Sequence, residues 1–301
     1  MPGAAPFNPV RFKRPTLLIV GCGDVGLRVA KLLRGRWRLV ALTSSPARCT
    51  ALRAAGAVPL VGNLDEPATL ARLAGLTDAV LHLAPPPPSG ASDPRTANLL
   101  HALARKPGLQ RIVYGSTSGV YGDCGGARFD ETRAVAPASD RARRRVDAEQ
   151  RLRAFGRTTG VRVTLLRIPG IYAGDREGGQ PRERVARGTP VLAASDDVYT
   201  NHIHADDLAR ACVAALHRGA PQRVVHASDD TEMKMADYFD LAADLAQLPR
   251  PPRLTFIDAA RHLSQMQMSF MAESRRLDNT RLKRELRVRL KYPTVATGLL
   301  A

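Results

Sequence analysis

The chain has 301 residues, of which 44% are hydrophobic and 24% charged, a composition that excludes a chain disordered throughout and fits one large α/β domain or two small ones. No run of about 18 or more apolar residues occurs, which excludes a transmembrane helix. The formal net charge of +17 raises the question of an anionic partner.

The amino-terminal segment and the cysteines indicate the compartment. Residues 1–14 are rich in proline and basic residues and contain no apolar segment, which predicts a short flexible leader rather than a secretory signal peptide. The four cysteines, Cys22, Cys49, Cys124 and Cys212, match neither a disulfide framework nor a zinc site. We therefore expect a protein of the reducing cytoplasm.

Two stretches carry most of the positive charge. Residues 133–157 hold eight arginines against three acids, and residues 275–291 hold eight basic residues against two acids. Such stretches contact phosphates in nucleic-acid-binding proteins, but they also form solvated helix faces. Only 5% of the residues are aromatic, so few side chains are available to stack on single-stranded bases. We expect solvated faces and keep nucleic-acid binding as the less favoured alternative.

The first predicted element is a buried parallel strand at residues 16–20, where the sequence is continuously apolar. A glycine-rich turn at residues 21–26 follows, and residues 27–33 form the first predicted helix. The side of this helix that faces the core is expected to carry Val25, Val29, Leu32 and Leu33.

Strands and helices then alternate along the chain. Further strands are predicted at residues 38–43, 58–61, 79–83, 111–116 and 163–168, and helices at residues 46–55, 67–73, 93–104 and 139–155. Asp93 is placed to cap the helix that Pro94 begins. The alternation predicts right-handed βαβ units and hence an α/β fold with a Rossmann-like, doubly wound parallel sheet.

The alternation weakens beyond residue 169. The sequence predicts an irregular loop with one short helix at 170–194, short strands at 200–203 and 224–226, a helix at 206–217, and a helical tail from 233 that is interrupted at 249–252. We expect a sheet core of residues 15–170 plus 198–228. A smaller, mostly helical subdomain of residues 171–197 plus 229–301 is expected over the carboxyl edge of the sheet, where such folds bind ligands.

The turn after the first strand has the spacing Gly-x-Gly-x-x-Gly. It follows a predicted strand and opens a predicted helix, which is the context of a dinucleotide-binding loop. Gly21 would permit the tight turn, Gly23 the approach of a pyrophosphate, and Gly26 close packing of helix on strand. The N-terminus of the following helix would hold the phosphate charge, and Asp24 and Val25 of the loop are also expected to contact the cofactor. The alternative is a glycine turn without a ligand.

The end of the second strand distinguishes between the two nicotinamide dinucleotides. An acidic residue there would bind a ribose 2′-hydroxyl, but this chain has Thr43, Ser44 and then Arg48. Hydroxyl groups with an arginine suit a 2′-phosphate, so we expect NADP rather than NAD. The alternative is that Ser45 and Pro46 only cap the next helix and that Arg48 is solvated.

Several segments, taken in chain order, resemble the extended branch of the short-chain dehydrogenase/reductase superfamily, the NAD-dependent epimerase/dehydratases. They are Gly-Asn-Leu-Asp at 62–65, Leu-His-Leu-Ala at 81–84, Ser-Thr-Ser-Gly-Val-Tyr-Gly at 116–122, Arg-Ile-Pro-Gly-Ile-Tyr at 167–172 and Ile-His-Ala-Asp-Asp at 203–207. The resemblance spans residues 16 to about 290.

The resemblance implies roles for individual positions. Those expected to bind the cofactor are Asn63 and Leu64 against the adenine, Leu83, Ala84 and Pro85 on the nicotinamide side, and Pro169 and Gly170 at the same end. Thr117 stands in the position of the family's catalytic serine or threonine, where its hydroxyl would bond a substrate carbonyl or hydroxyl. The alternative for Thr117 is a buried hydroxyl that bonds only to the backbone.

The chain departs from the family at the Tyr-x-x-x-Lys pair, whose tyrosine is the family's general acid/base. The two positions fall on Arg141 and Arg145 of the long helix. Arginine stays protonated and is a poor acid/base, but it can hold an anion or a carbonyl. The pattern resembles the atypical short-chain dehydrogenases, as do the glycine spacing and the segment at 277–286.

Other residues are weaker candidates for the site. Tyr121 or Tyr172 could replace the missing tyrosine, although in the relatives such tyrosines are structural or line the pocket. Asp123 and Cys124 could touch substrate, but a solvated carboxylate and a packed thiol are the favoured interpretation. Five methionines, Met233, Met235, Met266, Met268 and Met271, are expected to pack in the core or within the subdomain, and the alternative is that they line an adaptable hydrophobic surface.

His202 and His204 lie on one face of a predicted strand, close in sequence to Asp206 and Asp207, so a metal site is conceivable. The resemblance instead implies a strand-to-helix junction with an aspartate capping the helix, and we expect no metal.

The favoured function is therefore an NADP-binding, oxidoreductase-like protein that transfers a hydride to or from a small polar or anionic substrate. The long helix from Ser139 is the expected face of a possible homodimer. The alternative is a non-catalytic dinucleotide sensor or an RNA-binding protein on the same fold.

Overall fold

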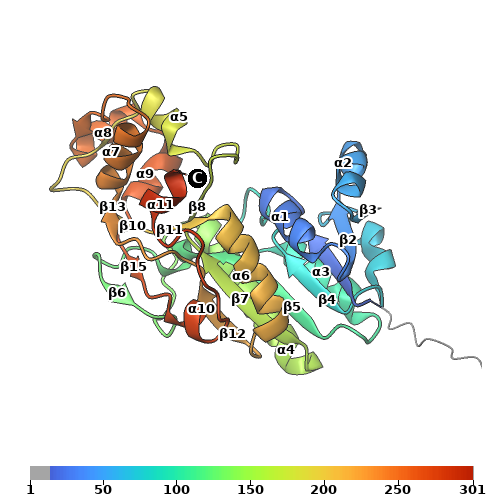
Figure 1. The fold of residues 1–301 in the computed structure, drawn as a ribbon. Coiled ribbons are helices and arrows are strands. Elements are labelled where there is room, and N and C mark those ends of the chain that lie inside the picture. The colour runs from blue at the N-terminus through green and yellow to red at the C-terminus, as the bar shows by residue number, and fades with distance from the viewer. Residues whose placement is uncertain (1–13, 301) are drawn as a thin grey trace, which may run out of the picture.

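A twisted sheet of seven parallel strands forms the centre of the protein (Figure 1). The computed structural model describes residues 14–300. In spatial order the strands are β12 (Arg223–His226), β7 (Arg162–Ile168), β5 (Arg111–Thr117), β4 (Ala79–His82), β1 (Thr16–Val20), β2 (Arg38–Thr43) and β3 (Val58–Val61). Strands β2 and β3 lie on one side of β1, and β4, β5, β7 and β12 lie on the other side. This change of direction in the strand order at β1 confirms the predicted doubly wound fold. Ligands of such sheets bind beyond the carboxyl ends of the strands at this reversal.

The strands are apolar because helices cover both faces of the sheet. On one face lie α1 (Asp24–Leu33), α6 (Ala205–Arg218) and α10 (Thr280–Arg284). On the other lie η2 (Pro67–Leu73), α3 (Pro94–Ala104) and α4 (Asp140–Thr159). The connection from β2 to β3 contains η1 (Pro46–Arg48) and α2 (Cys49–Ala54).

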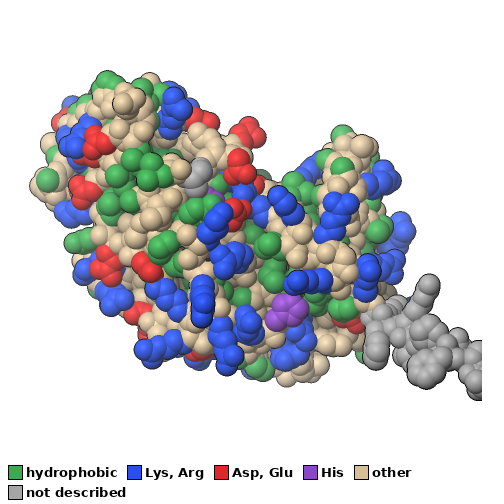
Figure 2. All heavy atoms as spheres, in the orientation of Figure 1, with side chains coloured by type: hydrophobic (Ala, Val, Ile, Leu, Met, Phe, Trp, Pro, Cys, Tyr) green, Lys and Arg blue, Asp and Glu red, His purple; other side chains and the backbone are tan. Residues whose placement is uncertain are grey.

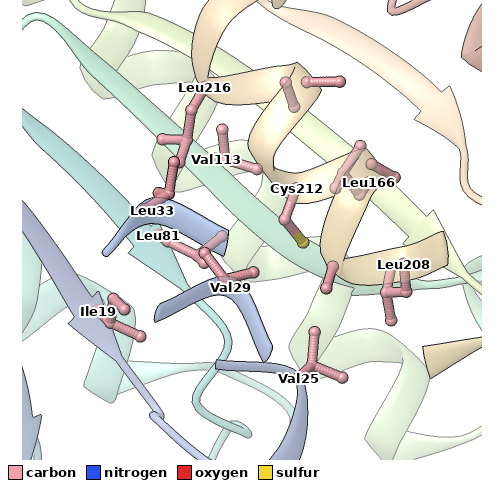
Figure 3. Close-up of a cluster of buried hydrophobic side chains, with 14 of the residues drawn as sticks. Ile19, Val25, Val29, Leu33, Leu81, Val113, Leu166, Leu208, Cys212 and Leu216 are labelled. Carbon is pink, nitrogen blue, oxygen red and sulfur yellow. The ribbon is translucent and has the colours of Figure 1, made fainter. Parts of the chain in front are cut away.

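Figure 3 shows how α1 and α6 pack together on the sheet. Val29 and Leu33 of α1 meet Cys212 and Leu216 of α6 above strand residues such as Leu81, and all of them are buried. This packing fixes α1, and with it the turn that precedes the helix, against β1.

The prediction that Leu32 of α1 faces the core is wrong. Leu32 is 45% exposed, whereas Val25, Val29 and Leu33 are buried. The helix begins at Asp24, earlier than predicted, and its buried residues follow a spacing of four. Leu32 stands about 100° around the helix from Leu33 and therefore faces solvent.

Several boundaries also differ from the prediction. The strand predicted at 200–203 is split into β10 (Tyr199–Thr200) and β11 (His202–His204), which pair with β13 (Met233–Lys234) and β8 (Gly170–Tyr172) outside the central sheet. The segment predicted as a helix at 67–73 is the 3-10 helix η2. The long helix runs on to Thr159, where Gly160 ends it in the left-handed conformation. The Asp93 cap is confirmed, because its side chain accepts a bond from the Thr96 amide.

A second, smaller lobe stands over the carboxyl edge of the sheet, at the upper left of Figure 1. Its helices are α5 (Pro181–Ala186), α7 (Met235–Leu245), α8 (Phe256–His262), α9 (Gln265–Met271) and α11 (Val295–Leu299). The short strands β9 (Val191–Leu192) and β14 (Arg253–Leu254) pair within this lobe. The short strands β6 (Arg128–Phe129) and β15 (Arg276–Leu277) pair with each other below it, beside the sheet (Figure 1). Two small apolar clusters hold the lobe together, one around Tyr172 and Phe239 and one around Leu192 and Met271.

Within residues 14–300, none of the helices is both long and apolar enough to cross a bilayer. The predicted leader lies outside the described residues except for Arg14.

Candidate functional site

The three glycines after β1 serve three different purposes. Gly21 has φ +84°, and a Cβ atom there would lie 2.3 Å from the amide nitrogen of Ala84. A Cβ on Gly26 would lie 3.3 Å from Cγ2 of Ile19, so this glycine lets α1 pack closely on β1. A Cβ on Gly23 would meet no described atom within 4 Å. Gly23 therefore faces open space, which leaves room for a ligand to approach the backbone.

The N-terminus of α1 points into this space. Its N-cap is Gly23, which has no side chain to bond the first amide groups of the helix. The first hydrogen bond of this turn runs from the Leu27 amide to the Gly23 carbonyl, at 2.9 Å. Free amide groups and the helix dipole together favour an anion at such a terminus.

The end of β2 is tied to the same loop. Arg48 Nη2 donates a 2.7 Å hydrogen bond to the carbonyl oxygen of Cys22. Thr43 Oγ1 accepts from the Ser45 amide at 3.2 Å, and the neighbouring Ser44 is exposed. The Ser45 side chain forms no cap hydrogen bond. Arg48 is thus held at the glycine loop instead of being freely solvated.

The turn after β3 uses its own polar groups. Asn63 Nδ2 donates to Glu66 Oε1 at 2.8 Å, and Asn63 Oδ1 accepts from the Asp65 amide at 3.1 Å. Leu64 packs into the core below. The side-chain amide of Asn63 therefore takes part in the hydrogen bonds of the turn.

Two cavities open beyond the carboxyl ends of the strands. One, of about 320 Å³, lies against the glycine loop and is lined by Gly21, Gly23, Asp24, Val25, Gly26 and Leu83 among others. The other, of about 880 Å³, lies under the second lobe and includes Pro85 and Gly170 in its lining. The two share Thr117, Arg145, Pro169, Ile171 and Arg176. An elongated ligand can therefore run from α1 towards the second lobe.

Thr117 stands at this junction because it is the last residue of β5. Its Oγ1 accepts a 3.2 Å bond from the Gly119 amide. An accepting hydroxyl keeps its own hydrogen for donation. The side chain is thus oriented by the backbone and also reaches both cavities.

Arg141 and Arg145, four residues apart on α4, both line the larger cavity. Arg145 Nη1 donates to Tyr114 Oη and to the Gly115 carbonyl, each at 2.9 Å. The Arg141 guanidinium stacks over the Phe270 ring, 4.4 Å from its centroid, and burial lowers the pKa of Arg141. Both side chains therefore present positive charge to a ligand.

The larger cavity is lined by many cations and by apolar side chains, and the two kinds are intermixed, since Arg141 stacks over Phe270 and Arg184 over Phe239. Its cations are Arg95, Arg141, Arg144, Arg145, Arg176, Arg184 and Arg275, against one carboxylate, Glu273. Its apolar wall includes Met235, Tyr238, Phe239, Met266 and Phe270. The expectation that all five methionines pack in the core or within the subdomain is wrong for Met266, which is 65% exposed because the short helix α9 turns it towards the cavity and solvent.

The two alternative tyrosines lie outside both cavities. Tyr121 Oη is 2.6 Å from His226 Nε2 and accepts from Arg167 Nη1 at 2.6 Å, and burial raises the pKa of Tyr121 to about 12. Tyr172 Oη donates to the Thr294 carbonyl at 3.3 Å. Both hydroxyls take part in the packing of the fold.

Asp123 and Cys124 are also structural. The Asp123 carboxylate accepts bonds from the amides of Ser274 and Gly125, and the first of these lowers the pKa of Asp123. Cys124 packs in an apolar cluster with Val120. Neither residue lines the two cavities.

Strand β11, which contains His202 and His204, leads directly into α6, but the residue predicted to cap this helix is wrong. His204, not an aspartate, caps α6, since its Nδ1 accepts from the Asp206 amide at 3.2 Å. Asp207 instead accepts the amides of Lys291 and Tyr292 at 2.8 Å each, which ties down the carboxyl-terminal segment. His202 stacks on Tyr238 at the cavity wall. Across residues 14–300, no three potential ligands are arranged to hold a metal ion.

The sequence analysis missed several cavity residues. They are Arg95, Arg144, Arg176, Arg184, Tyr199 and Arg275. Arg176 illustrates why, because it pairs with Asp24, 152 positions earlier in the chain. It stands in a stretch that reads only as an irregular loop, and no local spacing singles it out.

Comparisons with known proteins agree with this geometry. The model of the NAD-dependent epimerase/dehydratase family matches residues 17–227. A conserved protein of unknown function from Silicibacter pomeroyi is 32% identical over 95% of this chain and 97% of its own, with a TM-score of 0.81. No curated protein matches.

Two enzymes of known name share the fold at lower identity. UDP-glucose 4-epimerase from Thermotoga maritima is 19% identical over 94% of this chain and 96% of its own, with a TM-score of 0.77. dTDP-glucose 4,6-dehydratase from Streptomyces venezuelae, whose structure holds NAD, is 21% identical over 94% and 95%, with a TM-score of 0.75. From the family match and the relative of unknown function, we conclude that this chain belongs to the NAD-dependent epimerase/dehydratase family.

Proposed function

We propose that this chain binds a nicotinamide dinucleotide along the carboxyl edge of the sheet and transfers a hydride to or from a small polar or anionic substrate. The observation that carries the proposal is the junction of the two cavities at Thr117, Arg145 and Pro169. The residues fit the cofactor, because Gly23 leaves its side of the loop open and the α1 N-terminus has no side-chain cap. When bound, the dinucleotide supplies the hydride donor or acceptor.

The chain's own residues bind and orient the substrate. The Thr117 hydroxyl donates a hydrogen bond to the oxygen on the reacting carbon. Arg145, anchored by Tyr114 and Gly115, stabilises negative charge that develops on that oxygen. Arg141 holds an acidic group of the substrate, while Phe270 limits the access of water. The α4 sequence contains neither tyrosine nor lysine, so these side chains stabilise the charge on the oxygen, and water supplies the proton that the oxygen takes up after hydride transfer or receives the proton released in the reverse reaction.

The proposal includes a preference for NADP. Its support is Arg48, which is exposed and anchored on the glycine loop next to the hydroxyls of Thr43 and Ser44. The related dTDP-glucose 4,6-dehydratase from Streptomyces venezuelae holds NAD, so the preference needs its own test.

Isothermal titration calorimetry with NADPH and NADH tests the proposal. Calorimetry is preferred to the fluorescence of the single tryptophan, because Trp37 directly precedes β2, at the opposite edge of the sheet. We expect micromolar binding, tighter for NADPH than for NADH. Heat changes indistinguishable from dilution for both compounds would overturn the proposal.

The alternative of RNA binding gains no support from the two basic stretches. Several of their arginines pair with carboxylates, as Arg143 does with Asp140, Arg151 with Asp147 and Arg275 with Glu273. Figure 2 shows further Lys and Arg side chains along the lower part of one face, spread over several elements. The pairs on α4 are typical of a solvated helix face, whereas the Arg275–Glu273 pair is largely buried at the larger cavity. A dinucleotide sensor without catalysis remains the alternative, and Arg141→Gln separates the two, since it would leave a sensor unchanged.

A further inference from the structure

Asp24 places a carboxylate inside the proposed phosphate-binding loop. It is the first residue of α1, where a negative charge interacts favourably with the helix dipole. A phosphate at the same N-terminus would use the same dipole and amide groups. The Asp24 charge therefore opposes the binding of a dinucleotide unless it is neutralised.

Two arginines neutralise Asp24. Arg28 Nε donates to Asp24 Oδ1 at 3.0 Å, and Arg176 Nη1 donates to Asp24 Oδ2 at 2.5 Å. Arg28 also bonds Asp175 and Asp206, so its guanidinium is shared among three carboxylates. Within the described residues, Arg176 pairs with one carboxylate, that of Asp24, whereas Arg28 pairs with three.

The balance of charge in this cluster is unfavourable for an anionic ligand. Three carboxylates, Asp24, Asp175 and Asp206, face two guanidinium groups, Arg28 and Arg176. The diphosphate of a dinucleotide adds two further negative charges. A cation must therefore turn from a carboxylate to the ligand, and Arg176 is the one that lines both cavities.

We propose that Arg176 binds the diphosphate of the dinucleotide, and that Asp24 holds Arg176 beside the loop when no ligand is bound. This inference rests on the proposed function. Binding exchanges one charge-assisted hydrogen bond, to Asp24, for another, to a phosphate oxygen. The carboxylate of Asp24 is thus a competitor of the cofactor, and Arg176 is shared between them.

The exchange predicts effects of opposite sign at the two partners. Arg176→Gln removes a ligand of the diphosphate and should weaken binding roughly tenfold. Asp24→Asn removes the competitor and should tighten binding roughly threefold. A purely structural ion pair, which only fixes the loop to α1, predicts instead that both substitutions weaken binding or that neither changes it.

The experiment titrates NADPH and ADP-ribose into the full chain and its variants by calorimetry. ADP-ribose carries the diphosphate without the nicotinamide, so an effect of Arg176 on the phosphates must appear with both compounds. Asp140 and Arg143 provide a matched control, because Asp140 is the first residue of α4 and pairs with Arg143 outside both cavities. Asp140→Asn and Arg143→Gln should leave both affinities unchanged. The melting temperature of each variant shows that it is folded.

The affinities of the variants distinguish the exchange of Arg176 from a purely structural ion pair. Opposite shifts for Arg176→Gln and Asp24→Asn support the exchange. If the unmodified chain binds but Arg176→Gln binds ADP-ribose equally well, or if Asp24→Asn binds less tightly, the exchange is overturned while the proposed function stands. A chain that binds neither compound overturns both.

Discussion

The two cavities that meet at Thr117 are built in different ways. The one at the glycine loop is formed mainly by backbone: a turn that only glycine allows, a helix N-terminus, and a position without a Cβ atom. The one under the second lobe is formed by side chains from many separate segments, and arginine dominates it. Backbone geometry of this kind follows from residues adjacent in sequence. A side-chain cavity depends on how distant segments pack. We therefore expect the cavity at the glycine loop to lose its affinity for a ligand with almost any substitution of its glycines. The cavity under the second lobe should lose affinity in smaller steps as single side chains are replaced.

Gly23→Ala should have the largest effect. The added methyl group would meet no described protein atom, and the backbone angles of Gly23, φ −82° and ψ −152°, are open to alanine. We expect a normal melting temperature but a loss of dinucleotide affinity of roughly a hundredfold, because the methyl group occupies the ligand's approach. Calorimetry with NADPH measures this loss of affinity.

Gly21→Ala is the contrasting control. Its methyl group would lie 2.3 Å from the Ala84 amide nitrogen at a positive φ, so this variant should lower the melting temperature. A Gly23→Ala protein that still binds NADPH with full affinity would show that the ligand does not approach this loop.

The buried carboxylate of Asp229, a residue whose backbone amide donates to the carbonyl of the cavity residue His202, provides a pH test. Burial raises the pKa of Asp229 from 3.8 to about 7. The folded chain thus binds an extra proton between these values, and its stability falls as pH rises from about 4 to about 7. Asp229→Asn cannot ionise, so at pH 8 it should be more stable than the unmodified chain by roughly 4 kcal/mol, since each unit of the pKa shift is worth about 1.4 kcal/mol. At pH 4 the two should be equal in denaturant titrations.

Asp123→Asn is the control of opposite sign. The bond from the Ser274 amide lowers the pKa of Asp123, so the unmodified chain gains stability from this group as pH rises above the folded-state pKa. The asparagine variant should therefore be less stable than the unmodified chain at pH 8, and this difference should shrink as the pH falls through the folded-state pKa. Equal pH profiles for Asp229→Asn and the unmodified chain would contradict a pKa of Asp229 that burial raises.

Arg141→Gln should act on the larger cavity alone. 8-Anilinonaphthalene-1-sulfonate suits this cavity as a probe, since its sulfonate matches the arginines and its rings match Phe270 and Met266. We expect roughly tenfold weaker binding of the dye and unchanged binding of NADPH. Arg143→Gln, which lies outside the cavity, serves as the control. A parallel loss of NADPH affinity would mean that the two cavities are not separable.

Arg48→Gln should have the smallest effect, because the side chain is exposed. It should lower the preference for NADPH over NADH roughly fivefold and leave NADH affinity unchanged. Competition titrations measure the ratio. An equal loss for both dinucleotides would show that Arg48 acts through the Cys22 carbonyl on the shape of the loop instead of on a 2′-phosphate.

The same contrast explains what the sequence could predict. The central strands and the glycine turn were predicted because continuous apolar runs and glycine spacing are local signals. The prediction for Leu32 was wrong, because the buried residues of α1 follow a spacing of four and Leu32 stands about 100° around the helix from Leu33. The cap of α6 was assigned to an aspartate, but the ring of His204 reaches the Asp206 amide first. Arg176 had no local signal, because its partner Asp24 belongs to a different part of the chain.

The most direct test of the account is a crystal structure of the full chain grown with saturating NADPH. The account predicts the diphosphate within hydrogen-bonding distance of the amides of Asp24 and Val25, the Arg176 guanidinium turned towards it, and the nicotinamide beside Thr117 and Pro169. A dinucleotide bound with its phosphates away from residues 21–26, or with its nicotinamide outside the junction of the two cavities, would contradict the account.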